Sequence, residues 1–139
     1  MAIVVDANLF IVLINGDPRG DQVLTQVTGW FEQEIPLHAP DLVRYEVANA
    51  LTRSIRAGTF LQDELESAWS LFSGLPITYH PCIQGVRVVE IALSLGRQSA
   101  YDAAYLALAE TLEAELWTLD GSLYRNAVGQ GFAVRLLET

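Results

Sequence analysis

Short runs of β-branched and apolar residues alternate along the chain with longer segments in which apolar residues recur every three or four positions. The short runs have the composition of buried strands, and they lie at residues 3–5, 37–39, 77–79, 116–119 and 132–136. Strands that alternate with helices form a largely parallel sheet with helices on both faces. The pattern therefore predicts an α/β fold, a three-layer α/β/α sandwich with a mainly parallel sheet of four to five strands.

The segments between these runs have helical spacing, and Gly or Pro ends most of them. The Thr59-x-x-Gln62 pattern predicts a capped start for the fourth of them. The expected helices cover residues 8–14, 23–31, 41–57, 61–72, 88–95 and 100–109, and a short helix begins at residue 122. No repeat, low-complexity segment or linker divides the chain, so we expect a single domain over residues 1–139.

One carboxylate lies in a segment that is otherwise apolar. From residue 100 to residue 109, every residue except Asp102 is Ala, Leu or Tyr, which indicates a helix buried on all sides. A buried carboxylate is costly unless it is paired, hydrogen-bonded or bound to a metal. A capping box formed by Ser99 and Asp102 is the structural alternative to a functional role.

Three further acids are predicted to face the same space. Asp6 and Asp120 each follow a predicted strand, and functional groups of doubly wound sheets gather at the carboxyl ends of the strands. Glu46 shares a helix face with Val43 and Val47. The alternatives are that Asp6 and Asp120 cap helices, and that Glu46 is solvated or pairs with an arginine of its own helix.

A cluster of four carboxylates needs a counter-charge. Two like charges about 4 Å apart repel by roughly 4 kcal/mol at an effective dielectric constant of about 20. A divalent cation would relieve this repulsion, and an all-carboxylate donor set favours Mg²⁺ or Mn²⁺ over Zn²⁺. Such a site suits the hydrolysis of phosphodiester bonds, in which the metal activates water and stabilises charge on the phosphate.

Composition limits the other possibilities. The chain has 139 residues, 51% of them hydrophobic, and a net charge of −9, which excludes a broadly basic nucleic-acid-binding surface. Its apolar runs are too short to cross a membrane, so we expect a cytoplasmic protein. Cys82, the single cysteine, is expected to be a small buried side chain, and His38 and His80 lack the spacing of metal ligands.

Four stretches of the chain resemble the PIN-domain ribonucleases, and most of all the VapC-type toxins of toxin–antitoxin pairs. They are VDAN at 5–8, YEVANAL at 45–51, SAYDAAYLALA at 99–109 and TLD at 118–120. The resemblance implies that Asp6, Glu46, Asp102 and Asp120 bind one or two Mg²⁺ or Mn²⁺ ions. It also implies endonucleolytic cleavage of RNA, a homodimer, and neutralisation by a cognate antitoxin protein.

The resemblance further implies supporting roles for Asn8, beside the first Asp, and Thr118, beside the last. All eight basic residues are Arg, and those nearest the motifs, Arg44, Arg53 and Arg97, are candidates for contacts with RNA phosphates or antitoxin carboxylates.

The sequence is compatible with three other functions. A related nuclease could act on DNA or on structured RNA, because a pocket for a 2′-hydroxyl cannot be recognised from sequence. A phosphoacceptor domain also places aspartates at strand ends, but its family resemblance would require a lysine, and this chain has none. A catalytically silent binding module, in which the acids only cap helices, is the third alternative.

Overall fold

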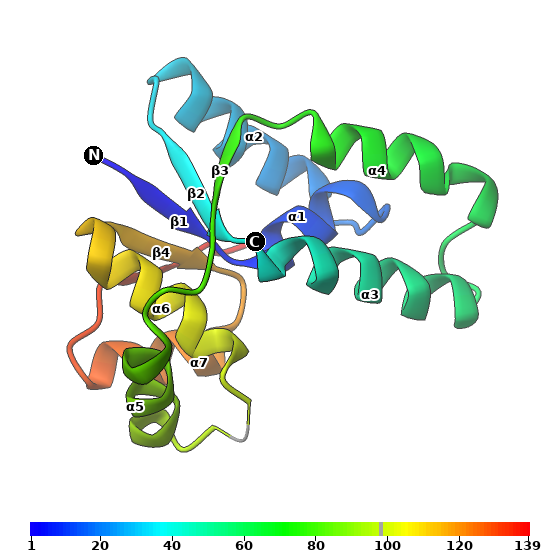
Figure 1. The fold of residues 1–139 in the computed structure, drawn as a ribbon. Coiled ribbons are helices and arrows are strands. Elements are labelled where there is room, and N and C mark those ends of the chain that lie inside the picture. The colour runs from blue at the N-terminus through cyan, green and yellow to red at the C-terminus, as the bar shows by residue number, and fades with distance from the viewer. Residues whose placement is uncertain (98) are drawn as a thin grey trace.

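The computed structural model describes residues 1–97 and 99–139, which fold into the predicted three layers (Figure 1). Strands β1 (Ile3–Val5), β2 (Leu37–Pro40), β3 (Ile77–His80), β4 (Glu115–Thr118) and β5 (Val134–Leu136) form one parallel sheet in these residues, in the order β3-β2-β1-β4-β5. The prediction of an α/β sandwich with four to five mainly parallel strands is thus confirmed.

Helices pack on both faces of the sheet. Those that join β1, β2 and β3 lie together on one face, and those that follow β3 lie on the other, as Figure 1 shows. Their bounds are α1 (Ala7–Ile14), α2 (Gly20–Glu32), α3 (Leu42–Arg56), the 3₁₀ turn η1 (Gln62–Glu64), α4 (Leu65–Ser73), α5 (Gly85–Leu95), α6 (Tyr101–Leu112) and α7 (Gly121–Gly129). None of the helices in the described residues is long and apolar enough to span a membrane.

The central strand is buried on both of its faces. All three residues of β1 are at most 2% exposed, and Leu116 of the neighbouring β4 is fully buried. Strands covered by helices on both sides need apolar residues at every position rather than at alternate positions. The uninterrupted Ile3-Val4-Val5 run therefore places β1 in the middle of the sheet, where its carboxyl end reaches the candidate site.

Three details of the sequence interpretation are wrong. The Thr59 hydroxyl donates back to the carbonyl of Ser54 (3.1 Å) and so closes the end of α3 instead of capping the next helix, which begins only at Leu65. Cys82 is exposed, because it lies in the connection that leaves the sheet after edge strand β3. The prediction of burial rested on the average preference of cysteine for protein interiors, and that average does not indicate where a particular cysteine lies in the fold.

The third error concerns α6, which is not buried on all sides. Tyr101 in its first turn is 61% exposed, whereas Ala103 and the residues 105–109 are buried. The body of α6 packs against β1, β2 and β4, but its first turn extends to the rim of the sheet. Asp102 is therefore only half-buried, at a place that solvent and ions can reach.

The two histidines pair with each other across β2 and β3. The Nδ1 atom of His38 lies 2.8 Å from Nε2 of His80, so one ring donates a hydrogen bond to the other. Burial, and then the neighbouring His80, lower the pKa of His38. This pairing gives both histidines a structural role between neighbouring strands.

Candidate active site

The chain reverses its direction of winding beside β1. From β1 it proceeds to β2 and β3 on one side, and then returns to β4 on the other side of β1. Ligand sites of doubly wound sheets lie at this switch point, outside the carboxyl ends of the strands. Asp6 directly follows β1, and Asp120 comes two residues after β4, so both acids flank the switch point.

Asp6 is held by a hydrogen-bond network that links β1 to β4. The fully buried Thr118 hydroxyl donates to Asp6 Oδ2 (2.8 Å), and Asn8 Nδ2 approaches the same oxygen (3.3 Å). Because the Thr118 oxygen donates its one proton to Asp6, it accepts from Asn8 Nδ2 (3.1 Å) and from the Asp120 backbone N–H (3.0 Å). Four polar residues from the two ends of the chain thus fix one another.

Asp120 also caps a helix. Its Oδ1 accepts the Leu123 backbone N–H (3.1 Å) at the start of α7, so the capping interpretation is confirmed at this position. The backbone N–H of Leu119 donates to Asn8 Oδ1 (3.1 Å). The orientation of Asp120 is therefore set by α7 on one side and by Asn8 and Thr118 on the other.

Glu46 extends from α3 toward α6. Its Oε1 accepts a short hydrogen bond, 2.6 Å, from the hydroxyl of Tyr105, which is 1% exposed. Among the described residues Glu46 makes no ion pair, so the alternative of an arginine partner on its own helix is wrong. The sequence interpretation missed Tyr105 and counted it as part of an apolar helix. The available signal was its spacing, three residues after Asp102 and hence on the same helix face.

Asp102 lies in the first turn of α6, opposite Arg97. The Arg97 guanidinium is 3.7 Å from Asp102 Oδ2, and both side chains are partly exposed. The predicted capping box does not form, because the Ser99 hydroxyl accepts the N–H of Tyr101 (3.2 Å) and α6 starts at Tyr101. Asp102 is thus not committed to holding the end of its helix.

The four acids act on one another electrostatically. The pKa of Asp6 is raised to about 7: burial is the largest cause, the Thr118 hydrogen bond opposes it, and the charges of Asp102 and Glu46 add to it. Burial also raises the pKa of Glu46. The Tyr105 hydrogen bond lowers this pKa, and the charge of Asp102 raises it. For Asp102, burial raises the pKa, Arg97 opposes this, and Asp120 adds to it. The acids thus form one coupled set that favours a cation.

The donor chemistry fits a hard divalent cation. Every donor is a carboxylate oxygen, which suits Mg²⁺ or Mn²⁺. As the side chains stand, no three His, Cys, Asp or Glu residues of the described chain lie close enough together to hold an ion. The site is thus an open, electrostatically coupled set of acids rather than a closed ligand cage. Mg²⁺ normally keeps several waters and uses few protein ligands, so an open set is compatible with it.

The three candidate arginines occupy different environments. Arg97 contacts Asp102, as described above. The Arg44 guanidinium lies 3.9 Å from the centre of the Tyr79 ring, in a cation–π contact. Arg53 is exposed on α3. Of these three, Arg97 is therefore the residue that the fold brings to the acids.

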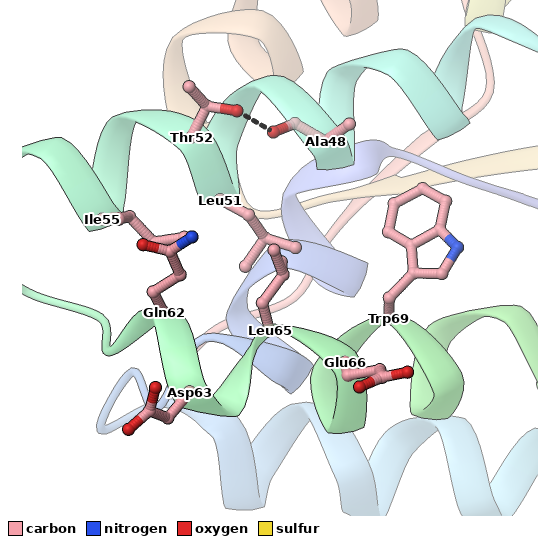
Figure 2. A pocket seen from close by; sticks show the side chains of 9 residues that line it. All are labelled: Ala48, Leu51, Thr52, Ile55, Gln62, Asp63, Leu65, Glu66 and Trp69. Atoms are coloured by element: carbon pink, nitrogen blue, oxygen red, sulfur yellow. Dashed lines mark hydrogen bonds between the residues drawn. The ribbon is translucent and has the colours of Figure 1, made fainter.

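A groove separates α3 from α4 (Figure 2). Its volume is about 870 Å³, and Leu51 and Leu65 point toward each other across it. Asp63 of η1 and Glu66 of α4 are acidic residues of its lining. A second hollow shares Ala48 and Trp69 with the groove and extends it along α3 to Arg44 and Tyr45, beside Glu46. The complete lining of the first groove is Ala48, Leu51, Thr52, Ile55, Gln62, Asp63, Leu65, Glu66 and Trp69.

Comparison with known proteins agrees with this geometry. The family model described as PIN domain matches residues 3–129. Ribonuclease VapC3 of Pyrobaculum aerophilum is 35% identical over 130 residues, which cover 88% of this chain and 92% of that protein. Ribonuclease VapC9 of Mycobacterium tuberculosis is 32% identical over 120 residues, 85% of each chain.

Among solved structures, VapBC2 from Rickettsia felis, bound to a DNA fragment from its promoter, has the same fold. The TM-score is 0.73 at 14% identity, with 99% of this chain and 100% of that chain covered. The chain therefore belongs to the PIN-domain family and, within it, to the VapC ribonucleases. The resemblance recognised in the sequence motifs is confirmed.

Proposed function

We propose that this protein is a metal-dependent endoribonuclease that acts as the toxin of a type II toxin–antitoxin module. The observation that carries the proposal is the coupled set of Asp6, Glu46, Asp102 and Asp120 at the switch point of the sheet, in a chain related to VapC ribonucleases. An RNA substrate would place this activity in the cytoplasm.

The four acids are the proposed ligands of one or two Mg²⁺ or Mn²⁺ ions. When bound, such an ion supplies a nucleophilic water and stabilises charge on the phosphate. The protein holds Asp6 through Thr118 and Asn8, and it orients Asp120 through the start of α7. Asn8 and Thr118 are therefore proposed as supporting residues, which keep two ligands in place before the ion arrives.

Arg97 is proposed as the first contact for an RNA phosphate. Its guanidinium lies near Asp102, and a cation bound by Asp102 would take over the role of that positive charge. Arg97 would then be available for a phosphate oxygen next to the ion. Arg44, in the first turn of α3, and Arg53, in its last turn, are proposed to contact RNA or antitoxin.

Cleavage of a mixed RNA pool tests the proposal. We expect wild-type protein with Mn²⁺ to cut the RNA, and we expect EDTA or the substitution Asp102→Asn to abolish cleavage while the far-UV circular dichroism is unchanged. Asp21→Asn, which changes an exposed acid of α2, is the matched control and should cut normally. Cleavage by Asp102→Asn at the wild-type rate would refute the site, and cleavage of single-stranded DNA in preference to RNA would refute the substrate.

An antitoxin is the proposed occupant of the groove between α3 and α4. The groove has apolar walls and the acidic residues Asp63 and Glu66 (Figure 2). The second hollow extends it along α3 to Arg44 and Tyr45. A segment with apolar side chains flanked by basic ones would match both features.

A synthetic helical peptide with Leu and Arg at helical spacing is a suitable probe of this groove. Trp69 fluorescence should respond to the peptide, and the charge reversal Glu66→Lys should weaken binding. Glu32→Lys, an exposed position on α2, serves as the control. Equal binding by Glu66→Lys and by wild type would contradict this placement.

A homodimer is proposed through the outer face of α5. Val86, Val89 and Leu93 of α5, with Ile83 just before the helix, form an uncharged strip, each between 53% and 80% exposed. In a chain with net charge −9, two copies meet with least repulsion along an uncharged strip, and a two-fold axis sets the strip against itself. Light scattering should show a dimer for wild type, a monomer for Leu93→Glu and a dimer for Leu24→Glu, an exposed control on α2. A monomeric wild type would refute the proposal.

A further inference from the structure

Tyr105 is a buried side chain with its polar atom at the acids. Its ring is among the largest fully buried groups of the core, and its hydroxyl donates to Glu46 Oε1 at 2.6 Å. A distance of about 2.5–2.7 Å is typical of a charge-assisted bond between a hydroxyl and a carboxylate. A buried tyrosine hydroxyl normally finds a partner, and here the partner is one of the four acids.

The position of Tyr105 on α6 brings it to the centre of the site. It lies one helical turn after Asp102, on the same face. Its hydroxyl is also close to the charge of Asp6 and to the backbone N–H of Ala7, at the start of α1. Tyr105 of α6 thus bonds to Glu46 of α3 and lies near Asp6, which directly precedes α1.

The hydrogen bond offsets a repulsion that acts on Glu46. The Glu46 side chain is flexible and half-buried, and Asp102 and Asp6 carry the same charge. Without an attractive partner on the inner side, Glu46 would favour rotamers that point to solvent. Tyr105 supplies that partner as a neutral donor from a rigid, buried ring, and within the described residues no other hydrogen bond reaches Glu46.

We propose that Tyr105 is the positioning residue of the metal site, which holds Glu46 through Oε1 and leaves Oε2 as the oxygen for the cation. This inference rests on the proposed metal-dependent function. Tyr105 itself contacts neither metal nor substrate in this arrangement. Partners that orient metal ligands typically change metal affinity or activity by about 10- to 100-fold when removed, and we expect an effect of this size.

The test compares Tyr105→Phe with wild type in the full chain. Phe keeps the ring and removes only the hydroxyl. Tyr124→Phe, on α7, is the matched control. Mn²⁺ affinity is measured by titration calorimetry, and RNA cleavage is measured as a function of Mn²⁺ concentration. We expect Tyr105→Phe to bind Mn²⁺ about 10- to 100-fold more weakly and to regain cleavage at saturating Mn²⁺, and Tyr124→Phe to behave as wild type.

A double-mutant cycle with Glu46→Gln isolates the contact. If Tyr105 acts through Glu46, Tyr105→Phe should have no further effect on Mn²⁺ affinity once Glu46 has lost its charge. Unchanged Mn²⁺ affinity in Tyr105→Phe with a lowered melting temperature would show a merely structural role and overturn this inference alone. Failure of the wild type to bind Mn²⁺ would instead overturn the proposed function, and this inference with it.

The wild type provides a second measurement if Tyr105→Phe does not fold. The shared proton of the Tyr105–Glu46 bond should give a low-field proton resonance that is protected from exchange. Binding of Mg²⁺ to Glu46 should shift this resonance, and the Mg²⁺ dependence of the shift should match that of binding. A resonance that does not move at saturating Mg²⁺ would overturn the inference.

Discussion

Ionisation of Asp6 should destabilise the metal-free protein, and the loss should be measurable as pH rises. The pKa of Asp6 is raised from its ordinary value of 3.8 to about 7, mainly by burial and further by the charges of Asp102 and Glu46. Between these two values the native state holds a proton that the unfolded state has released, so the free energy of unfolding falls as pH rises. At about 1.4 kcal/mol per pH unit, the full effect is about 4 kcal/mol, complete above pH 7.

The substitution Asp6→Asn should remove this dependence. The amide oxygen of Asn can still accept from Thr118 and Asn8, but the side chain no longer ionises. The NH₂ group of Asn cannot accept a hydrogen bond as the second carboxylate oxygen could. Burying it without a partner costs about 1–3 kcal/mol of stability, but this cost is the same at every pH. Relative to wild type, the metal-free variant should therefore gain stability steadily as pH rises from about 4 to about 7.

Urea unfolding with EDTA at a series of pH values measures the effect. The quantity of interest is the difference between the unfolding free energies of Asp6→Asn and wild type, because the titratable groups outside the coupled set contribute equally to both. Asp21→Asn, an exposed change, should give a difference that is independent of pH. If the curves of wild type and Asp6→Asn run parallel, the argument from burial is refuted. Adding Mn²⁺ at high pH should reverse the order, since only the intact site gains from the ion.

Four further outcomes are expected. Mn²⁺ at about 100 times its dissociation constant should stabilise wild type by about 2.7 kcal/mol in calorimetry, and Asp102→Asn should show much less gain. Cys82 should react with a thiol reagent in the native protein, and Cys82→Ser should change stability by no more than about 0.5 kcal/mol; a reaction that requires denaturant would contradict its exposure. Gly96→Ala should cost about 1 kcal/mol or more in urea unfolding, because Gly96 ends α5 with a φ of +68°, whereas Gly85→Ala, at the start of α5, should not. The His38 ring should titrate below pH 6.5 by proton NMR, with His38→Gln to assign the signal, and titration above that value would contradict the paired arrangement.

The architecture could be predicted because its signals are local. The β-branched run of β1 and the apolar spacing of the helices are each contained in a few consecutive residues, and strand–helix alternation has few possible topologies. Asp6 and Asp120 could be placed at one edge of the sheet for the same reason. The sequence motifs then identified the family.

The contacts within the site could not be predicted, because they join distant parts of the chain. The Thr118 hydroxyl and Asp6 are 112 residues apart, and Tyr105 and Glu46 are 59 apart. Helical spacing indicates which face Glu46 shares with Val43 and Val47, but not which neighbour covers that face. The errors at Cys82 and Thr59 have the same origin, since residue preferences describe an average environment and not the particular connection in which a residue lies.

The order of the strands has a consequence for how the chain folds while it is being synthesised on the ribosome. Strand β1 is made first, but its neighbour β4 follows more than a hundred residues later and inserts beside it at the centre of the sheet. Until then, Asp6 lacks Thr118 and the acidic set lacks Asp120. A nascent chain therefore cannot complete the proposed nuclease site while β4 and the start of α7 are still inside the exit tunnel. The topology itself delays activity beyond the point at which most of the domain has been translated.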